Sequence, residues 1–211
     1  MKKMSILVGA LFTLITVLPA NAQVNFGVIG GLNLANLSVD PDQGVDLSNR
    51  TAFGIGGILS FGVGETLALQ LEPMFLQKGA KLKLSEQGFT LEAEIKVSYI
   101  EVPAMLKFAF GSGDTKPYVM AGPTVGYLLS AKVKDDMEEQ DIKDDVKNID
   151  FGLVFGGGVS LPMGNNTLFV EARYSLGLSD INDDPDDPDT SIKTKGIQIM
   201  AGITFPLGGG S

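Results

Sequence analysis

The sequence contains neither cysteine nor histidine. Without cysteine, the chain can build no disulfide framework and carries no lipid-modified N-terminal cysteine. Without histidine, it lacks the commonest metal ligand and the side chain that titrates nearest neutral pH. A Ser–His or Cys–His catalytic arrangement is therefore impossible. We expect no enzyme, no cofactor and no metal site.

Long apolar runs are also missing, except for a short one near the N-terminus. Residues 6–18 are mostly apolar and follow Lys2 and Lys3, and the Ala-Asn-Ala sequence at 20–22 fits a signal-peptidase site. A membrane-spanning helix needs about 20 apolar residues, so this run is too short to be one. We predict a signal peptide over residues 1–22; the alternative is a buried N-terminal helix.

Basic residues are fewer than acidic ones. The formal net charge is −9 for 211 residues, and it becomes −11 for the 189 residues that remain once 1–22, with its two lysines, is removed. This balance argues against nucleic acid or anionic lipid headgroups as partners through a general basic face. The remaining length suits one domain, which we place at 23–208, with a tail at 209–211.

What the chain does contain is a repeated alternation of apolar and other residues at the period of a β-strand. The alternating segments are residues 24–34, 51–61, 66–76, 89–108, 117–129, 149–161, 167–178 and 196–207. Short connections at 62–65, 111–116 and 162–166 alternate with the long ones at 38–50, 77–97, 130–148 and 179–195. The pattern predicts an all-β, eight-stranded antiparallel up-and-down transmembrane β-barrel, with its short turns on the periplasmic side.

The face opposite the apolar one carries many small residues. Glycine occupies it at positions 27, 31, 54, 56, 122, 126, 152, 156 and 158. Glycine weakens a strand that faces water, but small residues suit the narrow interior of an eight-stranded barrel. We therefore expect the apolar face to point outward to lipid.

The stretch 89–108 changes the phase of its alternation halfway. Apolar residues occupy odd positions up to Val97 and even positions from Ile100. The preceding strand changes at a matching height, since Leu82 and Leu84 follow apolar odd positions over 67–75. We interpret both as unbroken strands that leave the membrane near Ser98; the alternative is a β-bulge in each strand.

A turn near Glu86-Gln87 gives a register in which paired residue numbers sum to 173. Lys81 then faces Glu92, an opposite-charge pair that stabilises a sheet. The same register pairs Leu84 with Phe89, Leu82 with Leu91, Leu71 with Val102, Leu69 with Ala104, and Glu72 with Glu101.

Five charged side chains are expected inside at mid-strand: Glu72, Glu101, Lys107, Glu171 and Arg173. Because Glu72 and Glu101 would repel, we expect Arg173 or Lys107 to bridge them, or one carboxyl to hold a proton. The cluster could act as a gate or proton-linked site. We favour an ionic plug, because eight strands leave little room for a channel. Paired carboxylates also serve glycoside hydrolysis, but not deep in a closed barrel without a cleft.

Acidic residues collect in two of the long connections. The sequence DDPDDPD at 183–189 offers carboxylates to calcium, but it lacks the glycine turn and closing glutamate of an EF-hand. We favour an extended, disordered and solvated loop.

Six segments are distributed over nearly all of the chain after residue 22: FGVIGGLNLANL, LQLEPMFLQKGAKL, YIEVPAMLKF, YVMAGPTVGYLL, FVEARYSLGLSDI and GIQIMAGITFPLG. They resemble the porin-family outer-membrane β-barrel domain common in the Bacteroidota. The resemblance implies an eight-stranded outer-membrane barrel similar to the OmpA transmembrane domain, with PorT of a gliding-associated secretion system as a relative. One departure is that PLGGGS follows Phe205, where an aromatic residue usually ends the chain as an assembly signal.

The predicted function is that of a non-enzymatic outer-membrane barrel with an envelope-structural or surface-interaction role through acidic extracellular loops. The alternatives are a small-solute pore or an accessory barrel of protein secretion, and a secreted soluble barrel that binds a lipophile. Expected partners are outer-membrane lipid, the barrel-assembly machinery and envelope or extracellular proteins, with no nucleic acid. We expect a monomer with periplasmic termini.

Overall fold

The structure is a computed structural model that describes residues 23–41, 46–64, 66–86, 89–111, 113–135 and 138–207. At residues 46, 84–86 and 89–91 it describes the backbone alone. The predicted signal peptide, residue 208 and the predicted tail lie outside the described residues.

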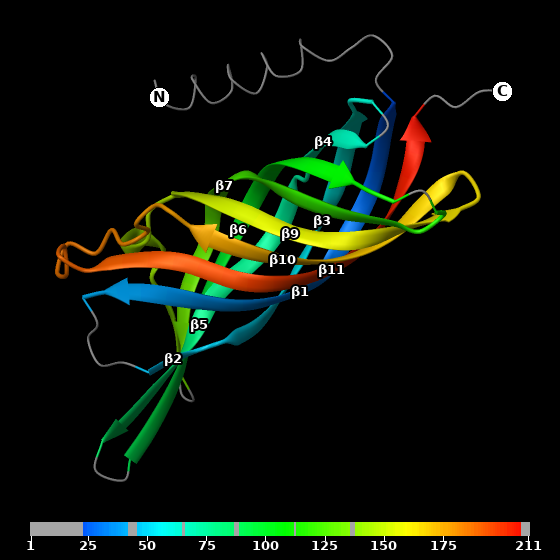
Figure 1. Ribbon diagram of the computed structural model, residues 1–211. Helices are drawn as coiled ribbons and strands as arrows, with labels where there is room; N and C mark the ends of the chain where they lie inside the picture. The colour runs from blue at the N-terminus through cyan, green and yellow to red at the C-terminus, as the bar shows by residue number, and fades with distance from the viewer. Residues whose placement is uncertain are drawn as a thin grey trace, which may run out of the picture.

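The described chain consists of antiparallel strands and one short 3-10 turn (Figure 1). The elements are β1 (Val24–Asp40), β2 (Asp46–Ser48), β3 (Arg50–Gly62), β4 (Leu67–Leu71), β5 (Met74–Glu86), β6 (Phe89–Ala109), β7 (Lys116–Lys134), β8 (Glu139–Asp141), η1 (Lys143–Asp145), β9 (Ile149–Met163), β10 (Asn166–Gly177) and β11 (Ser191–Leu207).

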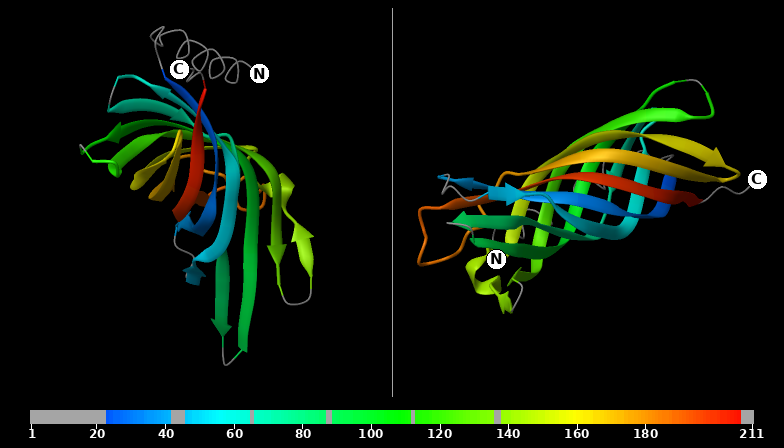
Figure 2. Two further views of the ribbon diagram at one scale, coloured as in Figure 1. Left: turned by 90° about the vertical axis from the view of Figure 1, so that its right-hand side faces the viewer. Right: turned by 90° about the horizontal axis from the view of Figure 1, so that it is seen from below.

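The pairings close a ring. It runs through β1, β3, β4 with β5, β6, β7, β9, β10 and β11, and β11 pairs again with β1 (Figure 2). β4 and β5 share one place in this ring, because Pro73 lacks the N–H that an unbroken strand would donate. Around this break the Glu72 amide donates to the Pro103 carbonyl at 3.1 Å, and the Gly57 amide to the Pro73 carbonyl at 2.9 Å. The eight predicted strands are therefore present, and the short strands β2 and β8 were not predicted.

The two ends of the ring differ in their connections. The links β3–β4, β6–β7 and β9–β10 are short and lie at the short-turn end. The links β1–β3, β5–β6, β7–β9 and β10–β11 lie at the opposite, long-loop end (Figure 1). The described termini belong to the short-turn end: Val24 pairs with both Leu207 and Phe61. The three predicted short turns are confirmed. The region 77–97, expected as a long connection, instead consists of the extended ends of β5 and β6, which stay paired as far as Glu86 and Phe89.

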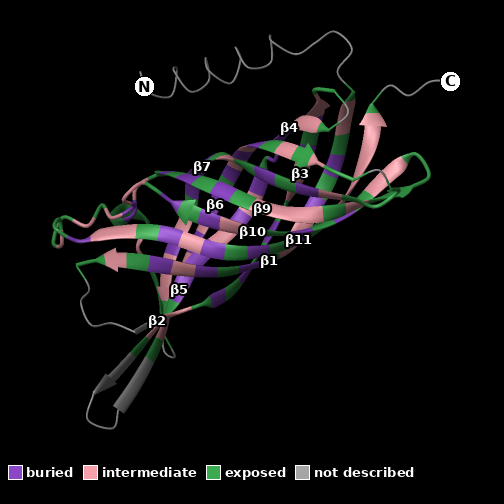
Figure 3. Cartoon of the chain, in the orientation of Figure 1, coloured by how far each residue is buried: buried purple, intermediate pink, exposed green. Residues whose placement is uncertain are grey.

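Burial alternates along the ring strands (Figure 3). Large apolar side chains are exposed on the outward face, up to 60% at Ile55. We call these outward side chains the apolar belt; it includes Val28, Leu32, Phe53, Ile55, Ile100, Leu106, Val119, Tyr127, Phe155, Val170, Ile197 and Ile199. The expectation that the apolar face points outward is confirmed.

At two inward positions, Gly31 and Gly122, glycine is required for a different reason from the one the sequence suggested. A Cβ on Gly122 would lie 1.9 Å from the Ala104 carbonyl oxygen, and one on Gly31 would lie 2.1 Å from that of Ile199. Both contacts are with backbone of the paired strand, which cannot move aside as a flexible side chain can. The neighbouring strand, rather than the volume of the lumen, therefore excludes larger residues at these positions.

β5 and β6 stay in one register from the pair Met74–Glu101 to the pair Glu86–Phe89. Along this stretch neither strand bulges against the other, as predicted, and Lys81 pairs with Glu94 beyond the apolar belt. The preceding strand is broken only earlier, at Pro73. A register shift does occur beside them: Ser98 and Tyr99 of β6 pair with Ser130 and Leu128 of β7, which leaves Leu129 as an extra residue in β7.

The predicted register itself was wrong by two residues. The observed paired numbers sum to 175, so that Leu84 faces Leu91, Leu82 faces Ala93, Leu71 faces Ala104, Leu69 faces Leu106, Lys83 faces Glu92, and Met74 faces Glu101. The last described pair of the hairpin is Glu86–Phe89, so Glu86, which was predicted to lie in the turn, is a strand residue.

Two groups of buried apolar side chains fill the interior. The larger one lies around Met74, Leu76, Met105, Tyr118, Phe169 and Met200. The second contains Leu37, Val97, Tyr99, Leu128, Val146 and Ile181, the last two from long connections that fold over the ring. In the described part of the chain, no helix has the length and apolar character needed to cross a membrane.

Candidate functional site

The structure places the predicted interior carboxylates and Arg173 on the inward face. Glu72, Glu101, Glu171 and Arg173 are each at most 2% exposed, and Lys107 is half-buried. These five side chains divide between two separate networks rather than forming one cluster.

The first, the Arg173 network, joins β4, β7 and β10. Arg173 donates from Nη1 to Glu72 Oε2 at 2.5 Å and from Nη2 to Glu72 Oε1 at 2.7 Å. Nη2 also donates to Glu171 Oε1, and Glu171 Oε2 accepts from Tyr118 Oη at 2.6 Å. Gln70 Nε2 donates to Glu72. The bidentate geometry and neutral donors satisfy most of the polar atoms that burial removes from water.

Lys107 lies at the edge of the Arg173 network. Its Nζ is 3.6 Å from the centroid of the Tyr118 ring and 5.8 Å from that of Phe169, a cation–π arrangement. It forms no ion pair with a described residue. The expectation that Arg173 or Lys107 bridges Glu72 and Glu101 was wrong, because the two-residue register error had placed these carboxylates together; Arg173 bridges Glu72 and Glu171.

The second, the Lys78 network, lies nearer the long-loop end. Lys78 Nζ pairs with Glu101 Oε2 and, at 3.2 Å, with Asp150 Oδ2. Asp150 also accepts from Thr194 Oγ1 at 2.8 Å and from Ser179 Oγ at 2.9 Å. The network thus ties β5, β6, β9 and β11 together across the lumen.

Sequence reasoning missed Lys78 and Asp150. The alternation of inward and outward positions could have identified both residues. Asp150 stands between the outward Ile149 and Phe151, and Lys78 lies two positions from the buried Leu76, on the same face of β5. Together the two networks bring four carboxylates and three cations, Lys107 included, into the described interior. That one carboxyl holds a proton stays a prediction.

The acidic connection at 183–189 is more compact than expected. Asn182 donates from Nδ2 to the carbonyls of Asp187 at 2.8 Å and Thr190 at 2.7 Å, and Asp184 accepts from the Asp186 amide at 2.8 Å. The expectation of an extended, disordered loop was wrong, because these bonds close local turns. Among the described residues, no three potential metal ligands come together.

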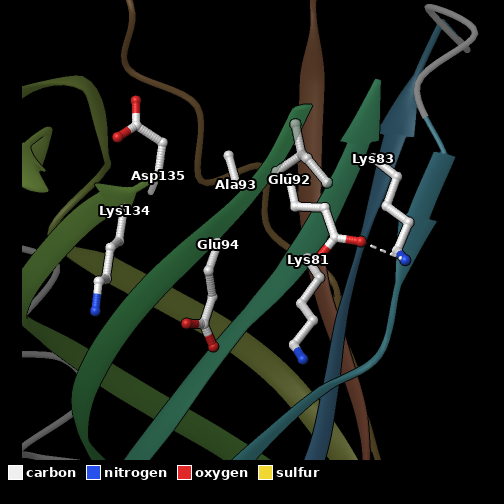
Figure 4. Close-up of a pocket in the computed structure, with 8 residues that line it drawn as sticks. Lys81, Lys83, Glu92, Ala93, Glu94, Lys134 and Asp135 are labelled. Atoms are coloured by element: carbon white, nitrogen blue, oxygen red, sulfur yellow. Dashed lines mark ion pairs between the residues drawn. The ribbon is translucent and has the colours of Figure 1, made fainter. Parts of the chain in front are cut away.

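Two hollows open at the long-loop end. One, of about 240 Å³, lies on the β5–β6–β7 wall, where three lysines face three carboxylates (Figure 4): Lys81, Lys83, Lys134, Glu92, Glu94 and Asp135. The other, of about 190 Å³, is mainly aliphatic and is lined by Leu37, Ile95, Val97, Ile142, Ile181 and Ile192. Neither hollow includes a member of the two buried networks.

A closed antiparallel ring with an apolar outside and an ionic inside agrees with the comparison to known families. The model of the outer membrane protein beta-barrel domain matches residues 20–183. The chain belongs to this family. Its membership assigns the barrel to the outer membrane.

Solved structures with the same fold are similar at low sequence identity. Neisserial surface protein A is 15% identical, with 86% of this chain and 97% of that chain covered and a TM-score of 0.51. Outer membrane protein OprG from Pseudomonas aeruginosa is 12% identical, with 89% and 98% covered and a TM-score of 0.51. A major outer membrane protein from Thermus thermophilus is 10% identical, with 89% and 100% covered and a TM-score of 0.55. These likenesses establish the fold alone. No curated protein sequence matches the chain.

Proposed function

We propose that this protein is a closed, non-enzymatic outer-membrane barrel with an envelope-structural or surface-interaction role. Its apolar belt contacts lipid, its termini are periplasmic and its long connections are extracellular. The observation that carries the proposal is the Arg173 network, in which the side chains of Arg173, Glu72 and Glu171 are all 0% exposed. Such a network crosses the lumen as a plug.

The energetics of the network favour a closed barrel over a pore. Opening a passage past Arg173 would separate it from two carboxylates and expose unpaired charges in a narrow interior. Removing one partner of a buried ion pair costs about 3–5 kcal/mol, so an open state that breaks two such contacts would be rarely occupied. The Lys78 network closes the lumen at a second level, nearer the long-loop end.

The surface role is assigned to the acidic connections between β7 and β9 and between β10 and β11. They are packed against each other, since the Lys147 amide donates to the Ile181 carbonyl at 2.8 Å and Val146 bridges to Asn182. Exposed carboxylates therefore stand on a folded platform: Asp144, Asp145, Asp183, Asp186 and Asp189. We assign this platform to contacts with envelope or extracellular proteins.

The remaining assignments rest on the family and on the sequence. Membership of the family and the apolar belt support a membrane barrel over a secreted lipophile carrier. Insertion by the barrel-assembly machinery, a monomeric state and kinship with the Bacteroidota porin-family barrels are parts of the same proposal.

Conductance in planar lipid bilayers tests the plug. We expect no stable single-channel openings from the wild-type barrel, because both networks close its lumen. Arg173→Gln should produce brief openings, and Lys116→Gln, at the short-turn end, serves as the matched loss of one positive charge. Stable wild-type openings that disappear in Glu72→Gln or Arg173→Gln would show a conducting pore and contradict the proposal.

A further inference from the structure

At the long-loop end, several outward positions just beyond the apolar belt carry lysine. On each of β5, β6, β7 and β11, the first charged residue at an outward position beyond the belt is a lysine. With Lys193, one outward position further along β11, they form what we call the lysine rim: Lys81, Lys96, Lys132, Lys193 and Lys195.

The rim lies at the height of lipid headgroups. Toward the long-loop end, Lys195 lies two residues beyond the exposed Ile197, and Lys96 lies four residues beyond the exposed Ile100. At about 3.4 Å per residue and a strand tilt of about 40°, these lysines stand roughly 5 and 10 Å beyond the belt. The headgroup region of one leaflet is about 5–8 Å thick, and lysine stems bend toward an interface. The ammonium groups therefore reach the headgroups.

The opposite end has no such rim. Outward positions near the short turns carry apolar side chains, among them Phe26, Phe108, Phe110 and Leu207, each more than 40% exposed. Among the described strand residues of that end, none of the outward positions is charged. The barrel is thus built for two unlike headgroup layers.

The β11 part of the rim keeps its charge available. Lys193 and Lys195 form no ion pair with any described residue. Elsewhere on the rim carboxylates stand beside the lysines. Lys96 and Lys132 face each other directly in the sheet, an unfavourable pairing of like charges that Glu139 relieves in part, at 2.6 Å from Lys132 Nζ and 3.9 Å from Lys96 Nζ. Glu94 lies 3.7 Å from Lys96 Nζ and faces Lys81 across the β5–β6 pair.

We propose that the lysine rim binds anionic, phosphate-bearing lipid headgroups of the leaflet that surrounds the long-loop end. The occupant is a lipid rather than a free anion, because the rim continues directly from the apolar belt that contacts acyl chains. The inference concerns the outside of the barrel and does not depend on whether the lumen conducts. It also revises the view, based on a net charge of −11, that anionic headgroups are unsuitable partners, because Lys193 and Lys195 stand beyond the belt opposite the uncharged Ser38 and Asn36 of β1.

Native mass spectrometry of the detergent-solubilised protein, titrated with diphosphoryl lipid A or with zwitterionic phosphatidylcholine, tests the rim. We expect tighter binding of lipid A. Lys193→Gln/Lys195→Gln should weaken it about 25-fold, since each lysine near an anionic surface contributes a factor of about five. Lys116→Gln/Lys143→Gln is the control, because it removes the same charge from exposed positions off the rim.

Three outcomes would overturn the assignment. Equal losses in the two double variants would reduce the effect to overall charge. Equal affinity of the wild-type protein for both lipids would remove the phosphate preference. Competition by inorganic phosphate at a matched phosphate concentration would identify a free-anion site in place of a lipid site.

Discussion

Replacing Arg173 by methionine should destabilise the barrel more than any single surface-charge change. Methionine fills much of the arginine volume but leaves Glu72 and Glu171 facing each other without a cation. Both carboxylates are fully buried in the wild-type protein, and each accepts at least one Arg173 N–H. Removing one member of a buried ion pair costs about 3–5 kcal/mol, and we expect a loss in this range.

The loss should come from the orphaned carboxylates rather than from the missing arginine. The triple variant Glu72→Gln/Glu171→Gln/Arg173→Met removes the three charges of the ion pairs at similar volume and leaves Lys107 unchanged. Since apolar or neutral replacement of a whole buried ion-pair group is often near neutral, the triple variant should recover to within about 1–2 kcal/mol of wild type. Non-additivity of this size would show that the three side chains act as a unit.

Urea-induced unfolding in phosphatidylcholine vesicles, followed by the heat-modifiable gel mobility of the folded barrel, measures these differences. Lys83→Met is the control, because it breaks the Lys83–Glu92 pair, whose side chains are 52% and 58% exposed. Exposed ion pairs contribute little, so its midpoint should stay near that of wild type. An Arg173→Met midpoint equal to that of Lys83→Met, or a triple variant as unstable as Arg173→Met, would refute the reasoning.

Two further predictions concern the backbone and the loops. Gly122→Ala should lower the free energy of unfolding by about 1–3 kcal/mol or more, because its Cβ would overlap the backbone of β6, whereas Gly30→Ala, with its nearest atom at 3.5 Å, should be tolerated; similar unfolding midpoints would contradict the close approach. At Asp180, burial acts to raise the pKa, but the hydrogen bonds from Lys147 Nζ and the amides of Ile192 and Asn182 outweigh it and hold the pKa below its usual value. Because the folded pKa is lowered, this anchor stabilises the loop above the unfolded pKa and is lost as the pH falls through the folded value. The hydrogen-exchange protection factors of the loop, which correct for the intrinsic pH dependence of exchange, should fall on acidification below about pH 4, and Asp180→Asn should lower them at neutral pH; equal protection factors in both proteins at about pH 6 would exclude the anchor.

Strand parity explains why much of the architecture could be predicted. Lipid-facing and lumen-facing residues alternate at a period of two, so the apolar belt, the inward glycines and the inward Glu171 and Arg173 could be assigned from local sequence. The phase change in β6 was interpreted correctly for the same reason, since Val97 and Glu101 share one face although their polarity differs.

The pairing of side chains could not be obtained in this way. Parity is unchanged when a register slips by two residues, so the sums 173 and 175 predict the same faces but different neighbours. In the observed register Glu72 and Glu101 are not neighbours; Glu101 forms an ion pair with Lys78, and Glu72 forms one with Arg173. The contact between Glu72 and Arg173, which are 101 residues apart, depends on closure of the whole ring.

The sequence by itself determined the all-β class, the number of ring strands, the direction of most strand side chains and the presence of short turns at one end, because these follow from local periodicity and turn composition. Only the tertiary structure decided the division of the interior into two ion-pair networks, the close backbone contacts at Gly31 and Gly122, and the gathering of distant lysines into one rim. Each of these joins residues from different strands, and their spacing is set by register, bulge and ring closure together.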